Sequence, residues 1–274
     1  MAIGAREFAW VSEFVRRESS IVLEPGKEYL VETRLATLAR GEGFASVDEF
    51  LAELRARPAN GLHQRVVEAM TTNETSFFRD LHPFDAFRQV LLPELLVLNA
   101  ATRRLSVWCA ACSSGQEPYS LAMLLRDEAA RLAGWTVRIL ATDLSAAMVA
   151  RAQAGRYSQL EVNRGLPAPM LVRHFTKHGA EWVVKDELRA MVEFRTMNLA
   201  DSFGGLPPFD VVFLRNVLIY FDVATKRDIL GRVRRVLRPG GCLFLGGAET
   251  TLNLDDAYQR VTLGKAVAYR SPGG

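Results

Sequence analysis

The sequence predicts an all-α domain in residues 1–75, followed after a connecting segment at 76–103 by an α/β domain in residues 104–274. Apolar residues before position 75 recur only at helical spacing. From about residue 104, short β-rich runs alternate with helical patterns, which is typical of a doubly wound, mostly parallel sheet. Residues 155–190 interrupt this alternation with glycines, prolines and short apolar runs, so they predict a small inserted β subdomain.

The clearest helix of the first domain begins after Ser46. Val47, Phe50, Leu51 and Leu54 follow the i, i+3, i+4, i+7 pattern, and Ser46 with Glu49 forms a capping box before them. Further stripes are Phe8, Val11, Phe14 and Val15; Leu30, Leu35 and Leu38; and Leu62, Val66 and Met70. Together they predict a small helical bundle.

In the second domain, residues 105–109 form the first expected strand, and the next helix is expected near Pro118 because proline is favoured at the first helical position. A second strand at 136–141 leads to a helix capped by Ser145, and Asp222 is expected to cap a helix that continues to Leu237. Further strands are expected at 192–197, Phe209–Leu214, 242–245 and 266–269. In such a sheet, ligands bind at the carboxyl ends of the strands.

Composition narrows the class of protein. The 274 residues hold 34 Lys and Arg against 31 Asp and Glu, and a net charge of +3 is too small for a polyphosphate binder held mainly by charge. Acidic residues outnumber basic ones in residues 1–75, which argues against a nucleic-acid platform. Three cysteines, a first segment unlike a signal peptide and the lack of a membrane-length apolar run predict a cytoplasmic protein without membrane insertion.

The turn after the first strand, residues 110–118, contains one glycine where a dinucleotide fingerprint has three. A pyrophosphate is therefore disfavoured at this turn. Asp143 ends the second strand, where a carboxylate is well placed to accept hydrogen bonds from ribose hydroxyls. The turn and Asp143 together suggest that the domain binds a nucleoside without a diphosphate. An Asp at the end of a strand is also a common turn residue.

Two cysteine patterns resemble other kinds of site, a thioredoxin active site and a zinc site. Cys109-x-x-Cys112 has the spacing of a thioredoxin active site, but its helix starts later, so small residues packing a tight turn are the favoured interpretation. With His174 and His178 the same cysteines have zinc-ligand spacings, but about sixty residues separate the pairs instead of about a dozen. No metal site is expected.

A dense polar run, T-T-N-E-T-S-F-F-R-D, occupies residues 71–80 at the junction of the domains. It is consistent with an interdomain linker anchored by Phe77 and Phe78, or with part of a site. The tip of the strand Phe209–Leu214 is followed by Arg215, Asn216 and Tyr220, which places polar groups at the same crevice.

At this point the sequence resembles the CheR-type chemotaxis receptor methyltransferases. Six motifs match in order over nearly the whole chain: T-T-N-E-T-S-F-F-R at 71–79, C-S-S-G-Q-E-P-Y-S at 112–120, A-T-D at 141–143, M-N-L at 197–199, L-R-N-V-L-I-Y-F-D at 214–222 and L-R-P-G-G at 237–241. The resemblance implies a class I S-adenosylmethionine fold that forms glutamate γ-methyl esters on the cytoplasmic domain of chemoreceptors, with S-adenosylhomocysteine as product.

The resemblance also implies roles for residues at matching positions. Asp143 would hold the ribose, and Asn198 with Leu199 the adenine. Arg79 would take the methionine carboxylate, and Glu117 the ammonium or a nearby polar group. The remaining implied pocket residues are Asn73, Thr75, Arg215 and Asn216, with Tyr220 near the methyl group and, with Arg79, a candidate for alignment.

The implied chemistry needs no strong base, because a glutamate with a reference pKa near about 4.3 is ionised at pH 7. Two alternatives stay open: a methyltransferase for RNA or a small metabolite, and a cofactor-loaded scaffold that no longer transfers methyl groups.

Three departures from the family pattern stand out. The family often has a His-Ser pair where this chain has G-G-A-E at 246–249, and the helix expected at 27–40 has fewer basic residues than usual. In the family, some members tether themselves to a receptor C-terminal pentapeptide through a longer turn in the inserted subdomain. The turn within 175–184 is shorter here, with Gly179 as its only glycine. A member independent of that peptide is therefore expected.

Overall fold

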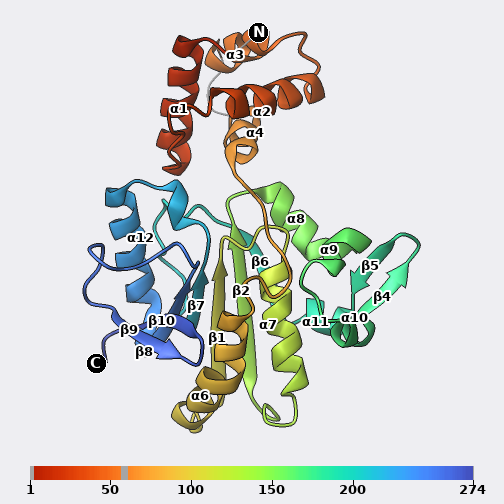
Figure 1. Cartoon of the computed structure of the whole chain (residues 1–274), viewed down its shortest axis with the longest axis vertical. Coiled ribbons are helices and arrows are strands. Elements are labelled where there is room, and N and C mark those ends of the chain that lie inside the picture. Colours follow the sequence, from red (N-terminus) through yellow and green to blue (C-terminus); the bar gives the residue numbers. More distant parts are fainter. Residues whose placement is uncertain (1–2, 57–60, 274) are drawn as a thin grey trace. The chain divides into compact units, whose positions relative to one another are not determined.

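The computed structural model describes residues 3–56 and 61–273, which fall into two units (Figure 1). The first unit contains the described residues up to Thr72 together with Tyr220–Thr225. The second contains Asn73–Ile219 and the described residues from Lys226 onward.

The described part of the first unit is helical, as predicted. Its helices are α1 (Ala5–Ser19), α2 (Glu28–Gly41), α3 (Val47–Ala56) and α4 (Gly61–Met70). The predicted stripes of α1, α3 and α4 supply most of the core. In α2, however, the buried stripe is Val31, Leu35 and Ala39, while Leu30 and Leu38 are only half-buried. The expected register of α2 was therefore wrong by one residue at two of its three positions.

The capping box before α3 is confirmed, with a small displacement. The Ser46 hydroxyl accepts the Glu49 N–H at 3.1 Å, whereas the Glu49 carboxylate accepts the N–H of Ala45 at 3.0 Å. The reciprocal bond therefore reaches one residue further back than in the usual motif, and both orphan N–H groups are satisfied.

The second unit contains a seven-stranded sheet in the order β6-β2-β1-β7-β8-β10-β9. Its strands are β1 (Arg104–Ala110), β2 (Thr136–Asp143), β6 (Val192–Thr196), β7 (Phe209–Leu214), β8 (Leu237–Leu245), β9 (Gln259–Leu263) and β10 (Ala266–Arg270). The five from β6 to β8 are parallel, and β10 and β9 add antiparallel pairs. The mostly parallel sheet is confirmed. β9, whose burial pattern is mainly exposed, was not predicted.

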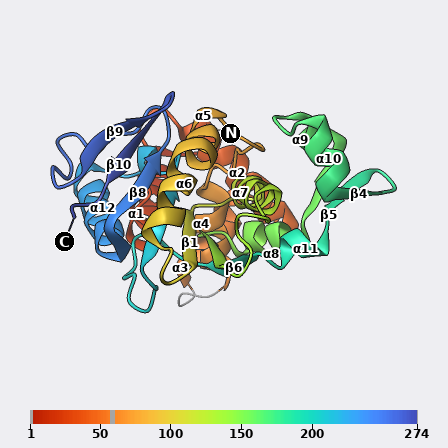
Figure 2. The same ribbon diagram turned by 90° about the horizontal axis from the view of Figure 1, so that it is seen from below.

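Helices cover both faces of this sheet. They are α5 (His82–Ala86), the π-helix η1 (Phe87–Leu91), α6 (Leu92–Leu98), α7 (Gln116–Asp127), α8 (Ala146–Ala154) and α12 (Val223–Val236). Seen from below, α6 and α7 lie on one face and α12 on the other (Figure 2). Residues 76–103, expected as a connecting segment, thus contribute three helical elements that belong to the second unit.

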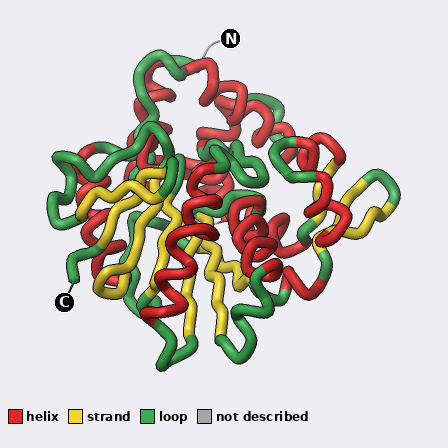
Figure 3. Tube along the Cα trace, turned by 60° about the horizontal axis from the view of Figure 1, so that its bottom comes forward, coloured by secondary structure: helices red, strands yellow, loops and turns green. Residues whose placement is uncertain are grey.

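The inserted subdomain has its own antiparallel sheet, set apart from the main one in Figure 3, with the order β3-β5-β4. Its elements are β3 (Arg156–Ser158), α9 (Gln159–Asn163), α10 (Ala168–His174), β4 (Phe175–His178), β5 (Glu181–Val184) and α11 (Asp186–Arg189). His178 pairs with Glu181, so only Gly179 and Ala180 form the β4–β5 turn, and Gly179 has a φ of 61°. Such tight hairpin turns favour residues with positive φ.

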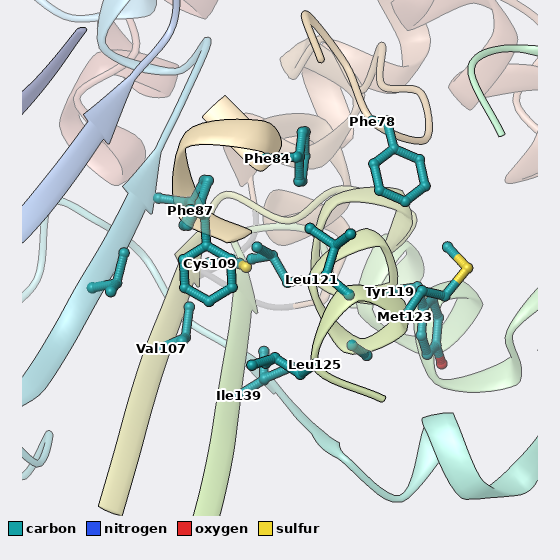
Figure 4. Packing of buried hydrophobic residues seen from close by; sticks show 14 of the residues in the cluster. Phe78, Phe84, Phe87, Val107, Cys109, Tyr119, Leu121, Met123, Leu125 and Ile139 are labelled. Carbon is teal, nitrogen blue, oxygen red and sulfur yellow. The ribbon is translucent and has the colours of Figure 1, made fainter. Parts of the chain in front are cut away.

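The core of the second unit lies between the sheet and the helices α5 to α7 (Figure 4). Phe84 and Phe87 both contact the ring of Phe213 on β7, at centroid distances of 6.0 and 6.2 Å. These aromatic contacts explain why the segment before β1 packs on the sheet: its apolar side chains are buried there instead of facing water.

Candidate active site

The carboxyl ends of β1, β2, β7 and β8 meet at one edge of the sheet, and the polar residues singled out in the sequence follow these ends. The loops 143–145 and 215–218 contain predicted site residues, and the loop 111–115 after β1 contacts the first of these loops. The loop 246–249 after β8 lies at the same edge. Parallel neighbouring strands place these loops side by side because their carboxyl ends point the same way.

The turn after β1 has an unusual backbone. Ala111, Ser113 and Gly115 all have positive φ, at 64°, 49° and 95°. A Cβ on Gly115 would lie 2.9 Å from the Cβ of Ala152 on α8, so this single glycine allows close packing of turn and helix. α7 begins at Gln116, directly after this turn, so Pro118, near which the helix was expected to start, is its third residue.

Asp143, at the end of β2, holds this turn. Its Oδ2 accepts the backbone N–H of Ser113 at 2.7 Å, and its Oδ1 accepts that of Ser145 at 3.0 Å. A carboxylate is a strong hydrogen-bond acceptor, so hydroxyl donors such as those of a ribose suit this position. Ser145 caps α8 as predicted, accepting the Met148 N–H at 3.2 Å.

Asn198 and Leu199 are brought beside Asp143 by the main chain, because the N–H of Met197 donates to the Asp143 carbonyl at 2.8 Å. The Asn198 side-chain oxygen accepts the Ala200 N–H at 2.9 Å, and Leu199 is buried. The residues predicted to hold the ribose and the adenine are therefore joined by this main-chain hydrogen bond in the second unit.

Arg215 forms the centre of the site's charge network. Its Nη1 donates to the Glu117 carboxylate at 2.9 Å, and its Nη2 donates to the Asp80 carboxylate at 2.6 Å and to the Arg79 carbonyl at 2.9 Å. Burial raises the pKa of the Glu117 carboxyl, and the adjacent Arg215 guanidinium opposes this rise. The buried Nε of Arg215 has no hydrogen-bond partner within the described residues.

This network gives two predicted site residues partners within the protein. Glu117 was expected at the ammonium of the ligand or a nearby polar group, and in the structure its partner is Arg215. Arg215 was expected to bind cofactor, and in the structure each of its two terminal nitrogens donates to a protein acceptor. Both lie at the predicted edge, and Arg215 acts there as a bridge between residues 79–80 and α7.

The segment 73–80 lies against the turn after β1. The Ser113 hydroxyl donates to the Asn73 carbonyl at 2.8 Å, and half-buried Thr75 follows two residues later. The half-buried Arg79 donates from Nη1 to the Glu74 carbonyl at 2.8 Å, while Glu74 itself pairs with Arg164 of the inserted subdomain. Arg79 therefore keeps nitrogen donors for an anionic ligand.

Phe77 and Phe78 anchor this segment, as the linker interpretation had suggested. The ring of Phe77 contacts Tyr157 and Phe175 of the inserted subdomain at 5.0 and 5.6 Å. A Cβ on Gly165 would lie only 2.1 Å from the Phe77 carbonyl oxygen, and Gly165 has a φ of 91°. The segment is thus anchored on the inserted subdomain and lies beside the turn after β1.

Tyr220 belongs to the first unit. Its carbonyl accepts the N–H of Val22 at 2.9 Å, next to the bridge between Ile21 and Phe221. Burial lowers the pKa of the Arg34 guanidinium, and the nearby Tyr220 opposes that shift. Asp222 accepts the Thr225 N–H at 2.9 Å and so caps α12 as predicted.

Sequence reasoning missed Glu249. Its carboxylate accepts backbone N–H groups from the turn that carries Asn216, at 2.8 Å for Asn216 itself. The available signal was the G-x-x-E run at 246–249 directly after a buried strand. It was noted only as a departure from the family pattern.

The environment of Cys109 and Cys112 disfavours a reactive thiolate. Cys109 and Cys112 are buried and not joined in a disulfide, and burial raises the pKa of both thiols well above their usual range. Within the described residues, no three His, Cys, Asp or Glu side chains group as metal ligands. In residues 3–56 and 61–273, no helix combines the length and the apolar character that crossing a bilayer needs.

Comparison with known proteins shows the family of the chain. Residues 73–267 match the model described as CheR methyltransferase, SAM binding domain, and residues 6–71 match CheR methyltransferase, all-alpha domain. The chain is 44% identical to Chemotaxis protein methyltransferase 1 of Pseudomonas aeruginosa and 42% identical to Chemotaxis protein methyltransferase Cher2 of Pseudomonas putida, over 99% of this chain and 100% of each relative. It is 38% identical to a chemotaxis protein methyltransferase of Vibrio parahaemolyticus, over 98% of both chains. The chain belongs to the CheR methyltransferase family, with that family's S-adenosylmethionine-binding domain in its second unit.

Proposed function

We propose that this protein transfers a methyl group from S-adenosylmethionine to glutamate side chains in the cytoplasmic domain of a chemoreceptor, forming γ-methyl esters for chemotactic adaptation. The observation that carries the proposal is the arrangement of Asp143, Glu117, Arg215 and Arg79 at one edge of a CheR-family sheet. The names of the relatives support a chemoreceptor as the substrate.

The residues present fit this cofactor. In our assignment, Asp143, at the end of β2, holds the ribose as a hydrogen-bond acceptor. Asn198 and Leu199 hold the adenine beside it, and Arg79 takes the methionine carboxylate. Glu117 faces the ammonium end, with its charge shared with Arg215. Further pocket positions are Asn73, Thr75, Arg215 and Asn216, and we assign Tyr220 to the methyl group.

When bound, S-adenosylmethionine supplies an electrophilic methyl group on a sulfonium. The protein has to align a carboxylate that is already ionised at neutral pH, so no general base is needed. No histidine occurs in the segments that form the edge, at 73–80, 110–118, 143–145, 197–199, 215–218 and 246–249. Arg215 offsets the charge of Glu117, which limits the repulsion that an incoming glutamate carboxylate meets.

Incubation with tritiated S-adenosylmethionine and receptor-containing membranes tests this function. We expect label in the receptor that mild alkali releases as methanol, because carboxyl esters hydrolyse and N-methyl groups do not. Membranes whose receptor has glutamine at the accepting positions are the control and should stay unlabelled. Alkali-stable label would refute esterification, and label in RNA or in a small molecule would refute a receptor substrate.

We also propose that recognition of the receptor uses the helical domain and the active site, without a C-terminal pentapeptide tether. The two-residue turn at Gly179 and Ala180 supports this, because β4 and β5 end immediately at it and leave no longer loop to hold a peptide. Lys177 on the edge strand β4 also opposes strand addition. Titration of a labelled receptor pentapeptide, followed by fluorescence anisotropy, should give no saturation at micromolar protein; saturable binding would refute this proposal.

A further inference from the structure

Glu249 lies in a cluster of main-chain donors. Its Oε2 accepts the N–H groups of Gly246 at 2.6 Å and Asn216 at 2.8 Å. Its Oε1 accepts those of Val217 at 2.9 Å and Leu218 at 2.7 Å. Four N–H groups from two loops therefore converge on one carboxylate, in the way that backbone nests bind anions.

The backbone around this cluster leaves little freedom. Asn216 has a φ of 57°, in the left-handed region, so its conformation needs support from elsewhere. A Cβ on Gly246 would lie 2.6 Å from the Asn216 Nδ2 and 2.7 Å from the Glu249 Oε2. Glycine at 246 and glutamate at 249 thus act together, since one makes room for the carboxylate and the other fills that room.

The turn that Glu249 holds is the one that carries the charge network of the site. Arg215 directly precedes Asn216 and connects Glu117 on α7 with residues 79 and 80. Glu249 is also near enough to Glu117 to raise the pKa of that carboxyl slightly, after burial has raised it more. The orientation of Arg215 and Asn216 therefore depends on Glu249, which lies 33 positions after Asn216 in the chain.

We propose that Glu249 is a positioning residue, whose ionised carboxylate fixes the turn at 215–218 and thereby orders the ligand-facing ends of β7 and β8. The inference rests on the proposed function only for the identity of the ligand. A neutral isostere cannot replace this carboxylate, because the amide nitrogen of glutamine would face two N–H donors that have no other acceptor in the cluster.

Glu249→Gln tests the requirement for charge, and Glu187→Gln is the matched control, since Glu187 forms an exposed ion pair with Arg126 away from the turn. Two quantities are measured on the full chain: S-adenosylhomocysteine affinity by calorimetry, and amide hydrogen exchange of residues 216–218 without ligand. In Glu249→Gln we expect affinity about tenfold weaker and exchange at least about tenfold faster, the range that follows from losing charge-assisted hydrogen bonds. Both quantities should be unchanged in Glu187→Gln.

Glu249→Ala adds a rescue measurement. Acetate should restore ligand affinity in this variant, because its carboxylate fits the vacated donors, whereas acetamide should not. Gly246→Ala disturbs the same cluster, because the added Cβ would collide with Asn216 and Glu249. It should therefore also speed amide exchange at 216–218. Wild-type affinity and exchange in Glu249→Gln, or equal recovery with acetamide, would overturn the inference. Neither readout uses a receptor, so a failure of methyl-ester formation would refute the proposed substrate and leave this test intact.

Discussion

Replacing Arg215 with methionine removes the cation at the centre of the site while keeping most of its volume. The side chain of Arg215 is 2% exposed and that of Glu117 is 11% exposed, whereas Asp80 is 55% exposed. Without Arg215, Glu117 remains buried without its ion-pair partner, and Arg79 alone still offsets part of its charge. The Asp80 carboxylate becomes hydrated, so the loss of its pair with Arg215 contributes little to the change in stability.

The expected loss of stability in Arg215→Met follows from the difference in burial between Glu117 and Asp80. Removing one partner of a buried ion pair costs about 3–5 kcal/mol, and losing the exposed pair adds at most about 1 kcal/mol. Protonation of Glu117 limits the cost, because burial raises its pKa in the folded state. The destabilisation is therefore smallest below the unfolded pKa of about 4.3 and grows as the pH rises through the folded value. The double variant Glu117→Gln with Arg215→Met leaves no buried charge and should recover part of the loss.

Urea unfolding can measure this loss of stability in the second unit alone. The chain has four tryptophans, and Trp10 is the one in the first unit. In a Trp10→Phe background the fluorescence reports Trp108, Trp135 and Trp182. A loss below about 1 kcal/mol at pH 7, or a double variant no more stable than Arg215→Met, would refute the role of the buried pair.

Asp143→Ala should weaken S-adenosylhomocysteine binding in calorimetry by about 1.5–3 kcal/mol, from lost hydrogen bonds to a charged group, and unchanged affinity would remove Asp143 from the site. Gly165→Ala should destabilise the second unit by more than about 2 kcal/mol, because the Cβ would collide with the Phe77 carbonyl at a positive φ. The control Gly231→Ala meets open space inside α12 and should be neutral or stabilising by up to about 1 kcal/mol; equal effects of the two substitutions in urea unfolding would contradict this. Asp222→Ala should cost about 1 kcal/mol through the lost cap of α12, whereas Asp222→Asn keeps most of it. Hydrogen bonding to Thr225 lowers the pKa of Asp222, so the contribution of its charge is present above the unfolded value of about 3.9 and is lost as the pH falls through the lower folded value. Thermal melts of these two variants from pH 7 to pH 3 should therefore converge toward wild type, and a constant gap would exclude this linkage.

Local patterns were enough to predict much of the fold. The period of apolar residues distinguished the helical domain from the α/β domain, and Ser46, Ser145 and Asp222 marked helix starts that the structure confirms. Such signals succeed because a cap or an amphipathic stripe involves neighbours within one turn of helix. The helix expected near Pro118 begins at Gln116, directly after a turn whose glycine packs against α8, and that contact is not encoded in the local sequence.

By itself, the sequence determined the chemistry that is available at the site: the acids, the arginines, the absence of histidine from the edge loops, and the six ordered motifs that indicated the family. Only the tertiary structure decided which of these groups meet. Arg215 pairs with Glu117 across 98 residues, and Glu249 reaches Asn216 across 33. These contacts follow from the strand order β1-β7-β8, which brings the ends of distant strands to one edge. Such pairings depend on the strand order of the sheet, which composition and local periodicity do not reveal.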